Sequence, residues 1–321
     1  MESITTTIEN LKATLDTYGV AILPSVLSDD ECAVMLKEMW DFFERIITGN
    51  TLQRNDKTTW REFYKLYPLH SMLVQYYSIG HAQFAWNLRQ NPKFVSIFAK
   101  LYDCPEDDLL VSFDGSSFHL PPEVTKRGWF NNKWLHTDQS FLDETSYCIQ
   151  SWVTALDINE GDATLVVLEK SHLFHEQFGK EHEKKSKDDW YKLTEDEIEW
   201  YKNVASCQEK RIQCPKGSLV LWNSKTIHCG VEPLRTRGTE NIRAVCYLCY
   251  QPKSLFTTKK DLDKCLKKKQ KAFAELRTTT HWPLKAKLFG KNPRTYGGKL
   301  PEIQPIQVPI LTEIGKKLAG F

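Results

Sequence analysis

Two short segments about ninety residues apart constrain the fold of this chain more than any other feature. Trp134–Gln139 carries His136 and Asp138, and Thr226–Gly230 carries His228. Residues i and i+2 of a β-strand point to the same face, whereas on a helix they would diverge by about 200°. His136 and Asp138 can therefore hold one metal ion from a strand, provided that a second strand brings His228 beside them.

The residue types of this set indicate a particular metal chemistry. Two imidazoles and one carboxylate are the ligands of a mononuclear non-haem Fe(II) site, which leaves further coordination positions open. Open positions let a co-substrate and O2 bind, as in an oxidation centre. A His-x-Asp tripeptide alone is weak evidence, because most such tripeptides lie on protein surfaces. The sequence nevertheless predicts His136, Asp138 and His228 as metal ligands and catalytic residues.

A basic residue at the start of an apolar run adds to this prediction. Residues 242–250 are apolar at both alternating sets of positions, which is typical of a strand buried on both faces, and Arg243 lies near its start. A buried guanidinium is costly unless it meets an anion, and its planar fork suits a carboxylate. The ordinary explanation is a salt bridge to a protein carboxylate, and the functional one is capture of the distal carboxylate of 2-oxoglutarate. Arg235 and Arg237, in the preceding loop, are the competing candidates.

The order of further motifs along the chain resembles that of a known family. The matching segments are Tyr18–Pro24, Leu27–Glu31, Trp134–Gln139, Ser151–Asp157, Gly161–Val167, Ser171–His172 and Lys216–Trp222. On these motifs the chain resembles the phytanoyl-CoA dioxygenase-like branch of the Fe(II)/2-oxoglutarate-dependent oxygenases, over roughly residues 10–252.

This resemblance implies a fold, a site and a reaction. The fold is mainly β with flanking helices (α+β), around a double-stranded β-helix core of the jelly-roll, cupin-like type. His136, Asp138 and His228 would bind Fe(II), Arg243 would bind 2-oxoglutarate, and Trp152 would line the co-substrate pocket. The implied enzyme is a dioxygenase that hydroxylates an unactivated C–H with O2 and releases succinate and CO2. Halogenating relatives replace the carboxylate ligand by a small residue, so the presence of Asp138 favours hydroxylation.

The length of 321 residues suits one large oxygenase domain. We expect N-terminal support at 1–105, the β-core at 106–252 with a polar insertion at 172–210, and a C-terminal extension at 253–321. The connections 118–134 and 173–209 are candidate lids over the site. The expected helices are 28–47, 71–90, 93–102 and 311–318, and the expected strands are 20–23, 109–113, 146–157, 164–168, 218–222, 226–229 and 242–250.

Capping boxes mark the start of two helices. Ser28–Glu31 opens the helix 28–47, and Thr194–Glu197 opens a short helix in the insertion. The candidates for burial on the helix 28–47 are Val34, Met39, Phe42, Phe43 and Ile46.

Charge and cysteine content limit the partners and the compartment. The 43 Lys and Arg nearly balance the 41 Asp and Glu, so nothing demands a polyanionic partner. No apolar run approaches the length of a membrane span. The nine cysteines show no disulfide-like spacing, and Cys246-x-x-Cys249 is read as a pair of core residues. Together these features favour a reducing, cytoplasmic compartment.

Three hypotheses of function follow. The first is oxidation of a small molecule, which the sequence favours. The second is the same chemistry on a protein or nucleic acid docked on the basic stretch 259–271, and the third is a non-catalytic protein that binds metal or 2-oxoglutarate. An enclosed pocket would favour the first, and a groove beside 259–271 the second. The sequence defines neither the substrate nor the oligomeric state.

Overall fold

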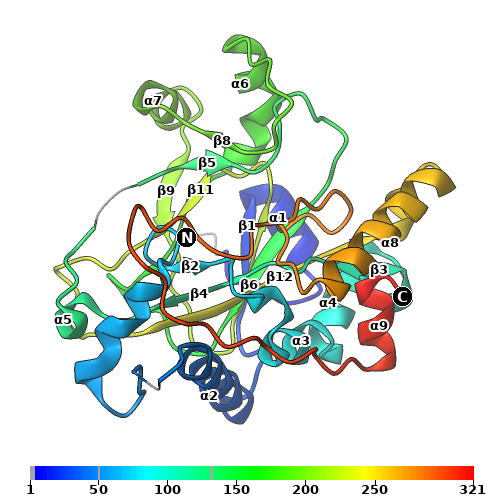
Figure 1. Cartoon of the computed structure of the whole chain (residues 1–321). Helices are drawn as coiled ribbons and strands as arrows, with labels where there is room; N and C mark the ends of the chain where they lie inside the picture. Colours follow the sequence, from blue (N-terminus) through cyan, green and yellow to red (C-terminus); the bar gives the residue numbers. More distant parts are fainter. Residues whose placement is uncertain (1–3, 50, 131–132) are drawn as a thin grey trace.

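Two antiparallel β-sheets form the centre of the molecule (Figure 1). The computed structural model describes residues 4–49, 51–130 and 133–321. The larger sheet has the order β1 (Val20–Leu23), β10 (Leu219–Asn223), β6 (Ile149–Thr154), β12 (Arg243–Pro252), β4 (Ser116–His119) and β2 (Leu73–Val74), with β3 (Leu109–Val111) beside the end of β12. The smaller sheet has the order β8 (Tyr191–Lys192), β5 (His136–Thr137), β11 (His228–Val231), β7 (Thr164–Glu169) and β9 (Gln208–Arg211). From β4 to β7 and again from β9 to β12, successive strands alternate between the two sheets, as in a jelly roll, so the predicted fold class is confirmed.

The central strands of the larger sheet are buried on both faces. On β10, Leu219 and Leu221 belong to the core beneath the helices, while Val220 and Trp222 belong to a second core between the two sheets. Val167 of β7 contributes to that second core from the smaller sheet. This alternation follows from the two-residue period of a strand and explains why these segments are apolar at every position.

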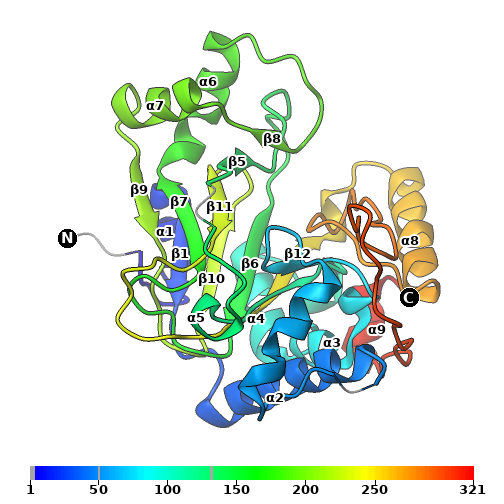
Figure 2. The same ribbon diagram turned by 60° about the vertical axis from the view of Figure 1, so that its left-hand side comes forward.

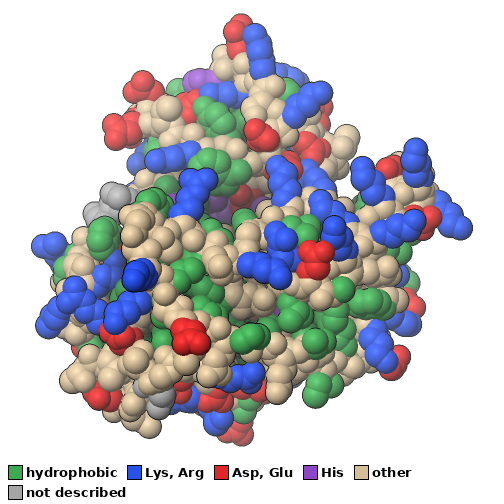
Figure 3. Space-filling model, viewed as in Figure 1, with side chains coloured by type: hydrophobic (Ala, Val, Ile, Leu, Met, Phe, Trp, Pro, Cys, Tyr) green, Lys and Arg blue, Asp and Glu red, His purple; other side chains and the backbone are tan. Residues whose placement is uncertain are grey.

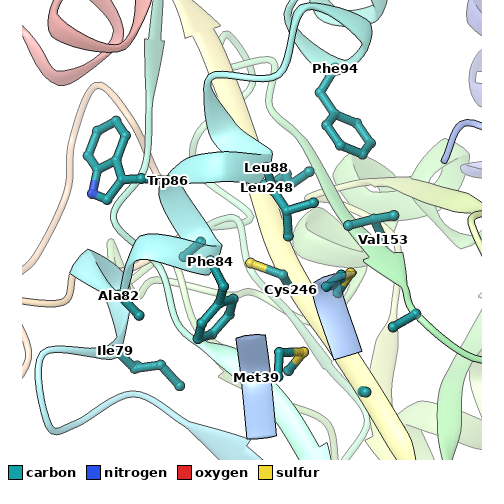
Figure 4. Packing of buried hydrophobic residues seen from close by; sticks show 14 of the residues in the cluster. Met39, Ile79, Ala82, Phe84, Trp86, Leu88, Phe94, Val153, Cys246 and Leu248 are labelled. Atoms are coloured by element: carbon teal, nitrogen blue, oxygen red, sulfur yellow. The ribbon is translucent and has the colours of Figure 1, made fainter. Parts of the chain in front are cut away.

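A layer of helices covers the outer face of the larger sheet (Figure 2). It contains α2 (Asp29–Ile46), α3 (Gln83–Arg89) and α4 (Pro92–Tyr102). Figure 4 shows Met39, Phe84, Leu88 and Phe94 of this layer around Val153 of β6 and around Cys246 and Leu248 of β12, while Trp86 of α3 points away from these strands. The remaining helices are α1 (Leu11–Tyr18), α5 (Pro122–Thr125), α6 (His175–Glu181), α7 (Glu195–Asn203), α8 (Lys259–Ala274) and α9 (Glu313–Ala319).

The predicted start of α2 is confirmed in detail. Ser28 accepts a hydrogen bond from the Glu31 backbone N–H, and the Glu31 carboxylate accepts one from the Ser28 N–H, which is a capping box. The predicted buried positions Met39, Phe42 and Phe43 are buried. Val34, grouped with them at sequence level, is 54% exposed, so that assignment was wrong.

The helix predicted over 71–90 was too long. Only its last part, α3, is helical, whereas the earlier residues form β2 and a short 3₁₀ turn at Ile79–His81. Ser71, Tyr77 and Ser78 have positive φ, which ends any helix at those points. Pairing of β2 with β4 supplies the backbone hydrogen bonds instead.

The insertion at 172–210 covers the outer face of the smaller sheet. It folds into α6, β8 and α7, and Thr194 and Glu197 form the predicted capping box at the start of α7. Phe178 of α6 and Tyr201 of α7 join a core cluster with Val166 of β7. The insertion is therefore part of the packed structure, and Figure 1 shows it above the smaller sheet.

The C-terminal extension runs along the large sheet and returns toward the site. Helices α8 and α9 form, and α9 covers most of the residues for which a short helix was predicted. Between them, the Thr279 backbone N–H donates to the Phe113 carbonyl at 2.9 Å, which ties residues 278–289 to the end of β3. Among the described residues, no helix is both long and apolar enough to cross a bilayer.

Candidate active site

Neighbouring strands of the smaller sheet bring three side chains together. β5 and β11 pair antiparallel with His136 directly opposite His228. The His228 Nε2 lies 3.2 Å from Asp138 Oδ2, and the His136 Nε2 lies 3.7 Å from Asp138 Oδ1. One donor atom from each of the three residues lies within 4.8 Å of the others, a spacing that one metal ion can bridge.

Hydrogen bonds orient both imidazole rings. The His136 Nδ1 lies 3.0 Å from the Trp134 carbonyl, and the His228 Nδ1 lies 2.8 Å from the Thr226 carbonyl. A carbonyl only accepts, so each Nδ1 carries the proton and each Nε2 offers its lone pair. The Trp134 indole stacks on His136 with ring centroids 4.4 Å apart and donates its Nε1–H to the Gly230 carbonyl of β11.

The protonation states also suit metal binding. Burial lowers the pKa of His136, which favours the neutral, ligating ring. Burial by itself would raise the pKa of Asp138, but His136 and His281 outweigh this effect and hold it well below its usual range. The Gln150 side-chain amide donates to Asp138 Oδ2 at 2.9 Å and fixes the carboxylate.

Arg243 lies at the start of β12 with its guanidinium buried. Its Nε donates to the Ser117 hydroxyl at 3.0 Å and its Nη1 to the Ala163 carbonyl at 3.2 Å. Among the described residues, no carboxylate lies within ion-pairing distance of it. Burial lowers the pKa of Arg243, while the interaction with Tyr247 acts in the opposite direction. The Trp152 indole, in the core between the sheets, lies 5.2 Å from the guanidinium.

The two competing arginines occupy different environments. The Arg237 side chain is buried and pairs with Glu123 at 2.7 Å and with Asp162 at 3.1 Å. Arg237 therefore forms the salt bridge that was the ordinary explanation for a buried arginine in this region. Arg235 is exposed, with its guanidinium 6.0 Å from the Trp129 ring. Of the three, only Arg243 is both buried and free of a protein carboxylate within the described residues.

A cavity of about 360 Å³ adjoins the three converging side chains. Figure 3 shows the molecule hollowed on this face, with histidine visible at depth and basic side chains around the opening. Ser117 and Tyr247, the neighbours of Arg243, lie on its wall, so the cavity runs from the three side chains toward the arginine. Its polar and aromatic lining includes His70, Gln75, Asp114, Trp134, Asp189, Trp190, Trp222, Thr280, His281, Trp282, Lys285, Lys287 and Phe289.

Part of the cavity wall was not predicted from the sequence. Residues 280–289 of the C-terminal extension close one side, and the His281 Nδ1 lies 4.0 Å from Asp138 Oδ2. Lys285 pairs with Asp143 at 2.8 Å and with Asp189 of the insertion at 2.9 Å, joining two segments far apart in sequence. Neither segment carries a periodic pattern that could have revealed this meeting. Of the candidate lid 118–134, residues 131–132 lie outside the described residues, and Trp134 lines the cavity.

Comparison with known proteins gives the family. A sequence model of the family described as phytanoyl-CoA dioxygenase (PhyH) matches residues 15–232, more than half of the chain. The chain belongs to the phytanoyl-CoA dioxygenase family. This confirms the resemblance to that family found in the sequence.

Individual relatives are distant. "Ava biosynthesis cluster protein O" of Aspergillus versicolor is 27% identical over 216 residues, which is 65% of each chain. A "putative phytanoyl-CoA dioxygenase" of Dictyostelium discoideum is 26% identical over 249 residues, 66% of this chain and 67% of that one. The chain thus spans about two thirds of the length of these relatives. A solved "putative oxidoreductase" from Salmonella typhimurium LT2 shares the fold, with a TM-score of 0.57 and 14% identity over 99% of this chain and 86% of that one.

Proposed function

We propose that His136, Asp138 and His228 bind Fe(II) and that the protein hydroxylates a small molecule with 2-oxoglutarate as co-substrate. The observation that carries the proposal is the convergence of the three donor atoms within 4.8 Å, with both Nδ1 atoms held by backbone carbonyls. A structural salt bridge would not require both imidazoles to present a free Nε2 to the same carboxylate. The donor set is that of the 2-His-1-carboxylate iron sites.

We propose Arg243 as the anchor for the distal carboxylate of 2-oxoglutarate, with Trp152 behind it. The buried guanidinium has polar neighbours in Ser117 and Ala163 but no carboxylate partner among the described residues. A buried cation of this kind is expensive to keep unless a ligand supplies the anion. The buried Trp152 ring lies 5.2 Å from the guanidinium, a distance at which the ring and the cation attract each other.

Each of these residues then has a physical role in the reaction. When bound, iron and 2-oxoglutarate supply the oxidation, in which O2 is consumed, succinate and CO2 are released and a substrate C–H becomes C–OH. Gln150 holds the Asp138 carboxylate, and the Trp134 stack holds His136, so the ligands need no rearrangement when the metal arrives. The aromatic cavity wall limits water around the reacting C–H.

The shape of the site supports a small-molecule substrate. The lining of the cavity includes no residue of α8, the basic helix considered as a docking surface for a macromolecule. Figure 1 shows α8 at the edge of the molecule, and the volume of about 360 Å³ suits a compact metabolite. One relative is named as a protein of a biosynthesis cluster, which also supports a metabolite substrate. The nine cysteines are free thiols, consistent with the proposed cytoplasmic location.

Anaerobic titration with Fe(II) and 2-oxoglutarate tests this proposal. The wild-type protein should give the visible charge-transfer band of the iron chelate, Asp138→Ala should lose it, and Arg243→Ala should need at least about tenfold more 2-oxoglutarate. Arg235→Ala is the matched control, since it removes an exposed arginine on the neighbouring loop. Absence of the band in metal-loaded wild type would overturn the proposal. A band that weakens in Arg235→Ala and not in Arg243→Ala would move the carboxylate anchor to Arg235.

A further inference from the structure

One buried carboxylate on the cavity wall, Asp114, forms no ion pair with a cationic side chain of the described residues. Asp114 lies between β3 and β4, is 7% exposed, and lines the cavity near the three converging side chains. One carboxylate oxygen accepts the Gly115 backbone N–H at 2.7 Å, and the Gln75 side chain hydrogen-bonds the group. Among the described residues, no lysine, arginine or histidine lies within 4.0 Å of it.

The backbone that carries this carboxylate is tightly held. The Arg89 Nη2 donates to the Asp114 carbonyl at 2.6 Å, while its Nη1 donates to the Gly80 carbonyl. A Cβ at Gly115 would lie 2.0 Å from the Val74 carbonyl oxygen, so β2 can pass this close only because residue 115 is glycine. The side chain therefore has a fixed origin beside Gln75, on the cavity wall.

Keeping this charge buried costs stability. Burial raises the pKa of Asp114 to about 6, while the Gly115 N–H and the more distant Arg89 act in the opposite direction. The group is thus mostly ionised at neutral pH, although it is buried without an ion pair. A buried charge without a partner is rare unless a ligand provides the opposite charge.

The cations on the cavity wall do not supply that charge. Lys285 is engaged by Asp143 and Asp189, and Lys287 is an exposed residue of the C-terminal segment. Arg243 is assigned to the co-substrate carboxylate. A second metal ion at Asp114 would need several oxygen or nitrogen donors, and one carboxylate with one amide is too few.

We infer that Asp114, with Gln75, is the anchoring site for a protonated nitrogen of the substrate, so that the substrate is a compact amine with a flat apolar body. This inference rests on the proposed function, since it places the substrate between the iron ligands and Asp114. The apolar body fits the remaining wall, where Trp134, Trp190, Trp282 and Phe289 are exposed to the cavity. Aromatic faces also attract cations, which favours an ammonium over a neutral group.

Three probes of similar shape and different charge test the inference: 2-phenylethylamine, 2-phenylethanol and 3-phenylpropanoate. Binding is followed by tryptophan fluorescence, because Trp134, Trp190, Trp222 and Trp282 all line the cavity. The protein is used with Ni(II) and 2-oxoglutarate, which prevents turnover, and also without metal. The amine should bind at least about tenfold more tightly than the alcohol or the anion, as expected for a charge-assisted hydrogen bond.

Variants assign the preference to the carboxylate. Asp114→Asn has the same shape and should bind the amine no better than the alcohol, while its affinity for the alcohol, which reports an intact cavity, stays at the wild-type value. Asp263→Asn, an exposed aspartate on α8, is the matched control and should keep the preference. Equal binding of amine and alcohol by wild type, tightest binding of the anion, or a preference that survives Asp114→Asn would each overturn the inference. If the protein forms no iron chelate but the metal-free protein still prefers the amine, only the proposed reaction is contradicted, and the inference about Asp114 stands.

Discussion

Two buried arginines on neighbouring parts of the chain differ in whether the protein supplies a carboxylate to neutralise them. Arg237 meets Glu123 and Asp162, so its charge is neutralised by the protein itself. Arg243, six residues later, meets a hydroxyl and a carbonyl and, among the described residues, no carboxylate. The first arrangement stabilises the loop before β12, whereas the second leaves a charge that a ligand can complete.

The same contrast separates the carboxylates around the cavity. Asp143 and Asp189 share Lys285, whereas Asp138 and Asp114 are buried without a lysine or arginine partner among the described residues. Charges that the protein neutralises hold its segments together, and charges that it leaves open are the ones that we assign to metal, co-substrate and substrate. Buried charges without an ion pair point to ligands where they reach the cavity, whereas Arg89, which is buried and binds the Gly80 and Asp114 carbonyls, is not part of the cavity lining.

The largest effect is expected at the metal ligands. Asp138→Ala should lower the affinity for Fe(II) by more than about 100-fold and abolish succinate formation, because removal of a ligand exceeds the effect of its hydrogen-bond partners. Asp162→Asn, which removes a carboxylate that the protein uses for Arg237, should keep metal binding. Metal affinity by equilibrium dialysis checks both. Equal metal affinity in wild type and Asp138→Ala would contradict the assignment.

Exchange of each arginine for glutamine should give opposite profiles. Arg237→Gln leaves Asp162 buried without its cation and should lower the free energy of unfolding by about 3–5 kcal/mol, with 2-oxoglutarate affinity unchanged. Arg243→Gln removes a cation that has no carboxylate partner among the described residues, so stability should change little while the affinity for 2-oxoglutarate falls by at least about tenfold. Urea denaturation and 2-oxoglutarate titration separate the two. If Arg243→Gln lowers the free energy of unfolding more than Arg237→Gln does, the proposed contrast between the two arginines is wrong.

Stability of the ligand-free protein should depend on Asp114 in a pH-dependent way. Its pKa is raised to about 6, above that of an unfolded aspartate, so the folded state binds the proton more tightly and loses stability as pH rises from about 4 to 6. Asp114→Asn should therefore be more stable than wild type by about 1–3 kcal/mol at pH 8, and the difference should vanish near pH 4. Urea denaturation at both pH values measures it. A variant less stable than wild type at pH 8 would show that the carboxylate is structurally required.

Much of the fold and the core of the site could be predicted because the information is local. The continuous apolar run of β12 indicated a strand buried on both faces, and the spacing of His136 and Asp138 placed both side chains on one face of an extended segment. The capping box at Ser28 fixed the start of α2. These are properties of neighbouring residues, so one sequence is enough to show them.

The rest of the site depends on long-range packing. Residues 280–289 have no periodic pattern, and only the structure shows that His281 lies beside Asp138. The helix predicted over 71–90 failed for the same reason, because pairing of β2 with β4 outweighs the local apolar pattern. Asp114 carried no sequence signal, since an aspartate after an apolar strand is ordinarily a turn residue.

The smallest effect is expected where the cavity wall is held by a partly exposed ion pair. Burial by itself would raise the pKa of Asp143, but Lys285 and the hydrogen bonds from Ser146 lower it to about 2, so these contacts contribute stability above pH 4 that is lost as pH falls toward 2. The Lys285 side chain is 35% exposed, and solvent screening limits the contribution to less than about 1 kcal/mol. Lys285→Met should therefore shift the thermal midpoint only slightly, with Lys316→Met, which removes an exposed pair on α9, as control. If Lys285→Met, but not Lys316→Met, lowers the free energy of unfolding by several kcal/mol, the ion pairs between the insertion and the C-terminal extension stabilise the whole fold and do more than hold the cavity wall.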